Sequence, residues 1–491
     1  MRRSLVFLSL CFCAICVHAQ QVYRLTLDDV VALAQSDAPD ALLASTRWER
    51  SHWTYQSFLA DFRPQILLQE NSSFNRSIES ITLPDGGQQY QDRAYMDNGL
   101  NLALEQDFAP TGGTIFLGSG LSRLDLFATA GMDARTSYLS TPVNLGFVQP
   151  LFQYNAMKWR RKVEPVVYEE SQKLYAEQME DVANQAAVYF FNLLISQLDA
   201  QAAIRDKANA DTLLVLSEGR FEVGKIAETD LLQIRLNAMQ AEARLAEAQL
   251  NMQTNAEQLR DFLDLQGQVD FDLVAPYDLP GILIDPPTAL DYAMNHRSDM
   301  IGFERRLMEA ESEVARSRGE TGVTASLVGQ FGFTQTGDEL NAVYQELLDQ
   351  EKVTFGITVP IADWGKAKAR RAVAQSNLEL VERQVDQERE NLRRTVLLRA
   401  QQFELVRRNA EIAEQSLDAA RLRYDITYQR YLIGKISVTD LNLALNDQEN
   451  ARRAYLQSIR EFWMALFEIR SLTLFDFVGN KSLMLAPPPV N

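Results

Sequence analysis

The chain has almost no residues with which to build a catalytic or metal centre. Its 491 residues include three cysteines and three histidines. Cys11, Cys13 and Cys16 all lie at the N-terminus, so no later thiol can form a disulfide or bind a metal. Phosphate loops, nucleophile elbows and dinucleotide fingerprints are also missing. We therefore expect no enzyme activity, no catalytic or metal-binding residue and no cofactor.

Residues 1–19 are typical of a secretory signal peptide. Arg2 and Arg3 precede an apolar run over residues 5–17, and a small residue, Ala19, ends the segment. Because the cysteines do not follow a lipobox pattern, we expect cleavage before Gln20 rather than a lipid anchor. The sequence thus predicts an exported protein.

After this leader the chain has no long hydrophobic run and no block of positive charge. The whole chain has a formal net charge of −18, which argues against nucleic acid as a partner. No apolar stretch reaches the ~18 residues that a membrane-spanning helix needs. If the protein enters a membrane, it must do so as β-strands, which alternate in hydropathy over segments of about ten residues.

A motif that occurs twice organises the rest of the chain. Residues 220–232 read RFEVGKIAETDLL and residues 430–442 read RYLIGKISVTDLN, 210 positions further on. Each copy interrupts a very long helical pattern that is rich in Ala, Glu, Gln, Leu and Lys. We therefore interpret each copy as a tight bend between two long antiparallel helices.

The repeat divides the chain into two structural halves. The first, residues 20–275, contains helices up to Arg63, an extended β segment over 64–152 and a long hairpin over 157–265. A Pro-rich connector over 276–287 follows. The second half, residues 288–475, has a β segment over 323–361 and a long hairpin over 365–467, and residues 476–491 form a tail. Polar loops are expected at 79–93 and 337–351.

The first half is longer than the second within its β segment. Asp40 and Asp299 occupy equivalent places 259 positions apart, whereas Pro150 and Pro360 are 210 apart, so the first half carries 49 extra residues. We place this excess in longer loops and an added hairpin over residues 79–140. Phe108, Phe116 and Phe127 of that insertion are compatible with an extracellular loop, a membrane strand or both.

The predicted strands are too few for one chain to close a barrel. Spanning strands must close on themselves, and single-chain bacterial barrels need at least about eight. This sequence supplies between four and six. Three copies would supply between 12 and 18 strands and would place their long helices side by side. The strand count therefore predicts an oligomer.

Over nearly its whole length after the leader, the chain resembles the TolC-like outer-membrane efflux family. The resemblance rests on the duplicated helix–strand–helix order, the LTLDDVVALA and ALDYAMNHRSDM starts, the QPLF and VPIADWG strand exits, and the paired bends. It implies a mainly α fold with membrane β: a homotrimeric α-helical barrel in the periplasm, continuous with a β-barrel in outer-membrane lipid. It also implies a passive efflux or type I secretion duct that works with a periplasmic adaptor protein and an inner-membrane transporter.

The resemblance also assigns roles to residues of the two bends. It places adaptor docking at the tips, which are Val223, Gly224, Lys225, Ile433, Gly434 and Lys435. It implies a periplasmic constriction with two aspartates three positions apart. Asp440 matches the first, whereas Leu443 stands at the second. A ring of three Asp440 carboxylates would favour cations, and mutual repulsion would raise their pKa values.

Structural roles compete with these functional ones. Gly224 and Gly434 are suited to a positive φ at a helix end, and Ser437 with Asp440 has the spacing of a capping box. Asp440 can therefore gate a pore, cap a helix or do both, while Lys225 and Lys435 suit solvated loops. The alternative function is a periplasmic coiled-coil structural or adhesion protein without a pore. The sequence names neither the exported substrate nor the adaptor.

Overall fold

The computed structural model describes residues 21–82, 84–129, 133–267 and 269–484. The expected signal peptide, its cleavage before Gln20 and the end of the C-terminal tail lie outside the described residues. The chain divides into two compact units. Among the described residues, unit 1 comprises those within 21–46, 175–296 and 394–484, and unit 2 comprises those within 47–174 and 297–393.

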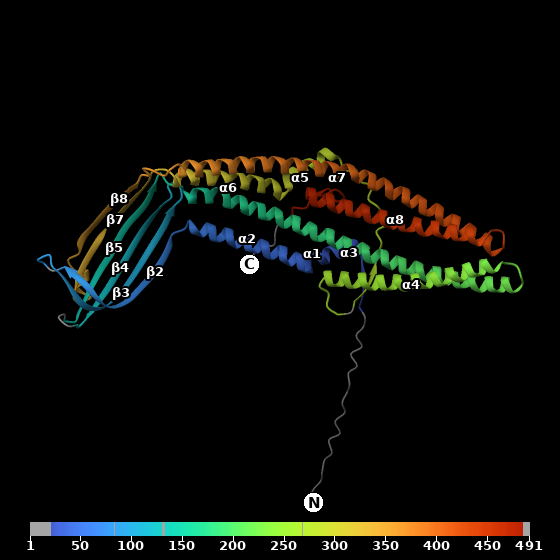
Figure 1. Cartoon of the computed structure of the whole chain (residues 1–491), viewed down its shortest axis with the longest axis horizontal. Helices are drawn as coiled ribbons and strands as arrows, with labels where there is room; N and C mark the ends of the chain where they lie inside the picture. Colours follow the sequence, from blue (N-terminus) through green and yellow to red (C-terminus); the bar gives the residue numbers. More distant parts are fainter. Residues whose placement is uncertain (1–20, 83, 130–132, 268, 485–491) are drawn as a thin grey trace, which may run out of the picture. The chain divides into compact units, whose positions relative to one another are not determined.

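Two long helical hairpins follow the duplicated motif. The first joins α3 (Ala156–Glu222) to α4 (Glu228–Phe262), and the second joins α7 (Lys366–Leu432) to α8 (Val438–Thr473) (Figure 1). Helices α3 and α7 both contain 67 residues, which corresponds to about 100 Å at 1.5 Å per residue. The fold is mainly α and duplicated, as the sequence predicts. Among the described residues, none of the helices combines the length and hydrophobicity that a membrane crossing requires.

Unit 1 contains a small parallel sheet that sequence patterning did not predict. β1 (Gln21–Leu25) pairs with β6 (Val269–Leu273), so the start of the described chain lies beside the segment that follows the first hairpin. Helix α1 (Leu27–Asp37) follows directly. Thr26 caps it, and a reciprocal capping box joins Thr26 to Asp29. Five-residue strands give too short an alternation to recognise without their partner.

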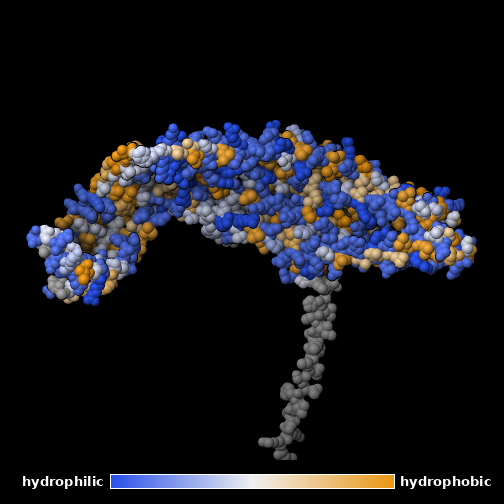
Figure 2. Space-filling model, viewed as in Figure 1, coloured by the Kyte–Doolittle hydropathy of each residue, from blue (hydrophilic) through white to orange (hydrophobic). Residues whose placement is uncertain are grey.

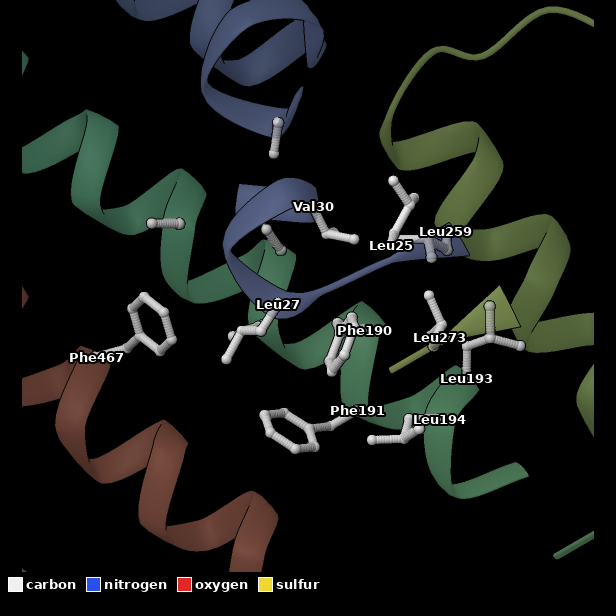
Figure 3. Close-up of a cluster of buried hydrophobic side chains, with 14 of the residues drawn as sticks. Leu25, Leu27, Val30, Phe190, Phe191, Leu193, Leu194, Leu259, Leu273 and Phe467 are labelled. Atoms are coloured by element: carbon white, nitrogen blue, oxygen red, sulfur yellow. The ribbon is translucent and has the colours of Figure 1, made fainter. Parts of the chain in front are cut away.

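The core of unit 1 lies where these strands meet α3. Phe190 and Phe191 are fully buried, and their rings meet edge to face. Side chains from five other elements surround them (Figure 3): Leu25, Leu27, Val30, Leu259, Leu273 and Phe467. The burial of these large apolar groups holds α1, α4 and α8 on the same stretch of α3.

The remaining short elements of unit 1 close around the end of α8. Helix α5 (Pro286–His296) contacts α8, and the His296 imidazole Nδ1 lies 3.1 Å from the Thr473 carbonyl oxygen. Strands β9 (Phe475–Asp476) and β10 (Lys481–Ser482) form a two-residue antiparallel pair. Tyr292 stacks on Phe475 with ring centroids 4.1 Å apart. Aromatic packing thus holds β9, after the end of α8, against helix α5.

Unit 2 contains one antiparallel sheet of six strands. Its strands, in spatial order, are β2 (Gln65–Thr82), β3 (Gln88–Phe108), β4 (Gly113–Phe127), β5 (Arg135–Leu151), β7 (Thr324–Gly337) and β8 (Leu348–Thr358). Helices α2 (Pro39–Asp61) and α6 (Ser298–Glu320) precede the two groups of strands, and a short 3₁₀ helix (Ala342–Tyr344) lies between β7 and β8. The first half of the chain contributes four strands and the second contributes two.

Two loops are shorter than predicted. Residues 79–93 are mostly strand, because β2 and β3 pair from Gln65↔Glu105 as far as Thr82↔Gln88. Residues 348–351, expected in a loop, belong to β8 and pair with β7. In both places the interstrand hydrogen bonds hold a polar segment extended despite its loop-like composition. The added hairpin within residues 79–140 is confirmed as β3 and β4, which pair within the same sheet as the other strands.

Candidate functional site: the hairpin tips

The two tips have the same backbone geometry. Gly224 and Gly434 have φ values of 69° and 72°. In the first tip, the Gly224 amide donates to the Phe221 carbonyl oxygen and the Lys225 amide donates to the Arg220 carbonyl oxygen, both over 2.8 Å. The second tip repeats these bonds at the equivalent positions. This is a Schellman ending, which satisfies the last carbonyls of the helix and favours glycine at the left-handed position.

The predicted docking residues all lie exposed at these tips. The Val223 and Ile433 side chains are 67% and 65% exposed, although both are large and apolar. Lys225 and Lys435 lie beside them, also exposed. Because each tip is a hydrogen-bonded turn that presents one apolar and one cationic side chain, it is suited to contact another protein. The structure brings all six predicted tip residues to the bends of unit 1.

The start of the following helix differs between the two hairpins. In the second, the Ser437 hydroxyl accepts from the Asp440 amide over 3.2 Å, and the Asp440 carboxylate accepts from the Ser437 amide over 3.3 Å. This confirms the capping box. In the first hairpin, Ala227 occupies the cap position and forms no side-chain cap bond with Asp230. Asp440 therefore has a definite structural role, and its carboxylate remains exposed.

A set of polar contacts joins the two hairpins just behind the tips. The Arg220 guanidinium donates to the Leu432 carbonyl oxygen over 2.9 Å and lies over the Tyr431 ring, 5.4 Å from its centroid. The Ser217 hydroxyl lies 3.3 Å from the Tyr431 hydroxyl. Further along, the Asn237 amide donates to the Asn442 side-chain oxygen over 2.9 Å. We call these five side chains and the Leu432 carbonyl the clasp.

Sequence reasoning did not predict the clasp, although one signal was present. Tyr431 is buried, whereas Phe221 at the equivalent position of the first hairpin is 40% exposed. The Tyr–Phe difference adds a hydroxyl to one copy only. A polar atom at a buried position requires a partner, and here Ser217 lies within reach. The two hairpins thus carry the same motif but contribute different side chains to the clasp.

A cavity of about 230 Å³ lies behind the clasp, between the four helices. Its lining includes Asp206 and Tyr424 together with apolar and amide side chains. Burial, together with the nearby Glu449 charge, raises the pKa of Asp206 above the usual carboxyl range. Burial raises the pKa of Tyr424 to about 12, with a further contribution from Asp206. The hairpins therefore enclose the Asp206 carboxylate in a cavity where water solvates it poorly.

The fold and the tips together define a class of protein. Two repeats, each joining a long helical hairpin to strands of a common antiparallel sheet, are the architecture of outer-membrane channels with a helical periplasmic tunnel. The family model of outer membrane efflux proteins matches residues 115–263 and 301–472. The chain belongs to this family, which confirms the resemblance seen in the sequence. It is an outer-membrane efflux channel with a periplasmic helical part.

Solved structures share the fold at low sequence identity. The Campylobacter jejuni outer membrane channel CmeC is 18% identical, with a TM-score of 0.62 over 94% of this chain and 87% of that one. The open-state channel MtrE of Neisseria gonorrhoeae is 15% identical, with a TM-score of 0.62 over 91% and 88%. VceC of Vibrio cholerae is 13% identical, with a TM-score of 0.62 over 92% and 96%. No curated protein matches the sequence significantly.

These relationships describe channels rather than enzymes. Members of the family form trimers and work with an adaptor and an inner-membrane pump. Among the described residues, no group of three or more His, Cys, Asp or Glu side chains could hold a metal ion.

Proposed function

We propose that three copies of this chain form a passive export duct, closed at rest at the hairpin tips. The observation that supports assembly most directly is the open sheet of unit 2. Within the described part of the chain, β2 and β8 are its two edge strands. Unpaired edge groups are not tolerated in a bilayer, and six strands are too few to close a barrel. Pairing β2 of one copy with β8 of the next removes all the edges.

The tips are the proposed contact with the adaptor. Val223 and Ile433 each present an apolar side chain at the end of a hydrogen-bonded turn, and Lys225 and Lys435 add positive charge. A partner with a small apolar socket and acidic neighbours would complement each tip. A trimer would present six such tips in two chemically related sets. An inner-membrane transporter would supply the energy for export through the adaptor.

Opening would require the clasp to break. The Arg220–Leu432 hydrogen bond, the Ser217–Tyr431 contact and the Asn237–Asn442 bond all join one hairpin to the other. If the second hairpin splays away from the first, these contacts are lost together. Each hydrogen bond contributes about 1 kcal/mol net, so the closed state would be favoured by a few kcal/mol per protomer. An adaptor bound at the tips could offset an energy of this size.

The constriction is the second part of this proposal. Asp440 lies one turn beyond the tip of the second hairpin, and its exposed carboxylate is oriented by Ser437. Three such carboxylates around one axis would favour cations and disfavour anions by Coulomb interaction. The aspartate three positions further on that the resemblance implies is replaced here by Leu443. We therefore propose a single acidic ring.

The test of the proposed function is extraction followed by bilayer recording. The mature protein should require detergent for extraction from the outer membrane, migrate as a trimer and form ion-conducting channels in planar bilayers. A protein that remains soluble and monomeric without detergent would contradict the proposal. Lys225→Cys or Lys435→Cys, carrying a photoactivatable crosslinker, should capture the adaptor, whereas a label at Asp264, beyond the far end of α4, should not.

A further inference from the structure

The strands β3 and β4 are the surplus of the first half of the chain. Without them each half would contribute two strands to the sheet. β3 and β4 contain 21 and 15 residues, and a spanning strand needs about 9–11. Both lie in the middle of the strand order, between β2 and β5, rather than at an edge of the sheet. The surplus hairpin is therefore long enough to cross a bilayer and is an integral part of the sheet.

One face of the sheet is apolar across the surplus strands as well as the others. Residues paired directly across neighbouring strands point to the same face. Leu104 of β3 pairs with Leu117 of β4, which in turn pairs with Leu145 of β5. The same row continues to Ile66 of β2 and to Phe331 of β7. One unbroken row of large apolar side chains thus crosses five strands.

The sixth strand continues this face beyond Glu351, which pairs with Phe331. Leu327 of β7 pairs with Phe355 of β8, and the neighbouring positions on the same face of β8 are Val353 and Ile357. These three β8 side chains are between 58% and 65% exposed, and Figure 2 shows hydrophobic residues interspersed with hydrophilic ones over the strands. In β3, Leu100 and Leu102 continue the apolar face, both about half exposed. We call this the apolar face.

The opposite face is polar in the middle of these strands, although Phe116, Leu124 and Leu126 of β4 also lie on it. Gln69 of β2 pairs with Asn101 of β3, which pairs with Gly120 of β4. Gly120 pairs with Thr141 of β5. On β8, Thr354 has the opposite parity to Phe355 and lies on this polar face. Apolar residues therefore take alternate positions at Leu100, Leu102 and Leu104 of β3 and at Ile115, Leu117 and Leu121 of β4, and Arg123 and Asp125 end this stretch of β4. A membrane strand between lipid and water shows such alternation over about ten residues.

We propose that β3 and β4 lie in the bilayer with their apolar face against lipid acyl chains, so that each protomer contributes six spanning strands. The proposal rests on the trimeric channel proposed above. Three copies then close a barrel of 18 strands instead of the 12 that two strands per half would give. An aqueous loop position for this hairpin would leave Leu100, Leu102 and Leu104 in water. The continuous apolar row assigns these side chains to lipid.

The two extra strands of each protomer would widen the lumen of the barrel through which solutes leave the cell. Barrel diameter grows roughly linearly with strand number, and barrels of about 16–18 strands enclose an open aqueous channel. The lumen would be about one and a half times as wide as that of a 12-stranded barrel by the same proportionality. Size selection would then fall to the periplasmic tips alone, and bulky solutes that pass them would meet no further restriction in the outer membrane.

The test uses the absence of cysteine after Cys16. Single cysteines are introduced into the full chain and spin-labelled, and the trimer is reconstituted in lipid vesicles. Accessibility to oxygen, which partitions into lipid, is compared with accessibility to a water-soluble nickel chelate. The matched variants on the apolar and polar faces of β3, β4 and β8 are Leu102→Cys and Asn101→Cys, Leu117→Cys and Ser122→Cys, and Phe355→Cys and Thr354→Cys.

We expect oxygen to be favoured at positions 102, 117 and 355, and the nickel chelate at positions 101, 122 and 354. If β8 alternates while both positions of β3 and of β4 favour the chelate, the inference about the surplus hairpin is wrong and the channel remains. If β8 also fails to alternate, the membrane position of the sheet, and with it the proposed function, is wrong. Electron microscopy of the unmodified trimer gives an independent readout, in which 12 spanning strands would overturn the inference and 18 would support it.

Discussion

The Arg220 guanidinium of the first hairpin donates a hydrogen bond to the Leu432 carbonyl oxygen of the second over 2.9 Å. That carbonyl belongs to the last turn of α7, where the Schellman ending satisfies other carbonyls but leaves this one available. Arg220 thus ties one tip to the backbone of the other, and its position over the Tyr431 ring adds a cation–π contact. Any outward movement of the second hairpin has to remove this bond.

Arg220→Ala should shift the channel toward its open state. The variant loses a charged hydrogen bond and a cation–π contact, together about 2–4 kcal/mol per protomer. Single-channel conductance in planar bilayers should rise. Arg430→Ala, at the repeat-related position, is the matched control and should conduct like the wild type. Equal conductance of Arg220→Ala and wild type would contradict the role of the clasp.

Gly434→Ala should destabilise the second tip. A residue with a Cβ at a φ of 72° costs about 1–2 kcal/mol, although the space around the position is open. Hydrogen exchange at the end of α7 should become faster by roughly tenfold for each 1.4 kcal/mol lost. Gly219→Ala, inside α3, is the control with the opposite sign, because alanine stabilises a helix interior by about 0.5–1 kcal/mol. Slower exchange in Gly434→Ala would count against the left-handed geometry.

The capping and pore roles of Asp440 can be separated. Asp440→Asn keeps a side-chain oxygen for the Ser437 amide but removes the charge, so cation selectivity should fall while thermal stability is nearly unchanged. Ser437→Ala keeps the charge and loses the cap, which should cost about 1 kcal/mol with selectivity retained. Reversal potentials in asymmetric salt measure the selectivity. Unaltered selectivity in Asp440→Asn would remove this carboxylate from the pore.

A buried ion pair joins α3 to α8 in unit 1. Glu180 is 2% exposed, and its carboxylate lies 3.2 Å from the Arg470 guanidinium. Burial raises the pKa of Glu180, and Arg470 opposes this effect. Arg470→Leu should therefore destabilise the protein by about 3–5 kcal/mol, because it leaves a buried carboxylate uncompensated. The double variant Glu180→Leu/Arg470→Leu should recover much of this loss in thermal unfolding, and a double variant less stable than Arg470→Leu would contradict this account.

Asp206 should make unit 1 less stable at neutral pH than in mild acid. Its folded-state pKa is raised, so the folded protein keeps a proton that an unfolded aspartate, with a pKa of about 3.9, has already lost. Between those two pKa values stability falls as pH rises. Asp206→Asn should therefore raise the melting temperature at pH 7, and the advantage should shrink on acidification.

The control for this prediction is Asp211→Asn, at an aspartate on the same helix whose carboxylate pairs with Lys207. Because that carboxylate is half exposed, its replacement should change stability little at either pH. A melting-temperature difference between wild type and Asp206→Asn that does not change with pH would show that burial of the charge is not the cause.

The local features of the hairpins could be predicted because they depend on residues close in sequence. Glycine, lysine and the Ser437–Asp440 spacing determine a Schellman turn and a capping box through bonds between residues three to five positions apart. The clasp could not be predicted in the same way. Ser217 and Tyr431 are separated by 214 positions, and no local pattern indicates which two side chains will meet.

Some of the strands could likewise be predicted from the sequence and others could not. Alternation identified most of them, but β1 and β6 contain five residues each and exist only as a parallel pair between the two ends of the first half. The ends of β2 and β3 next to their connecting turn were predicted as a loop because their composition is polar. Eighteen consecutive residue pairs between these strands, from Gln65↔Glu105 to Thr82↔Gln88, hold them extended.

The sequence by itself determined the duplication, the long helices, the positions of the bends and the family, because periodicity and glycine conformation act over a few residues. Only the tertiary structure decided that β3 and β4 pair within one six-stranded sheet, that a row of apolar side chains crosses five of its strands, and that Arg220 reaches Leu432. Those relationships are set by the register between strands and the packing of hairpins about 210 residues apart. Their energies depend on the whole fold rather than on any local segment.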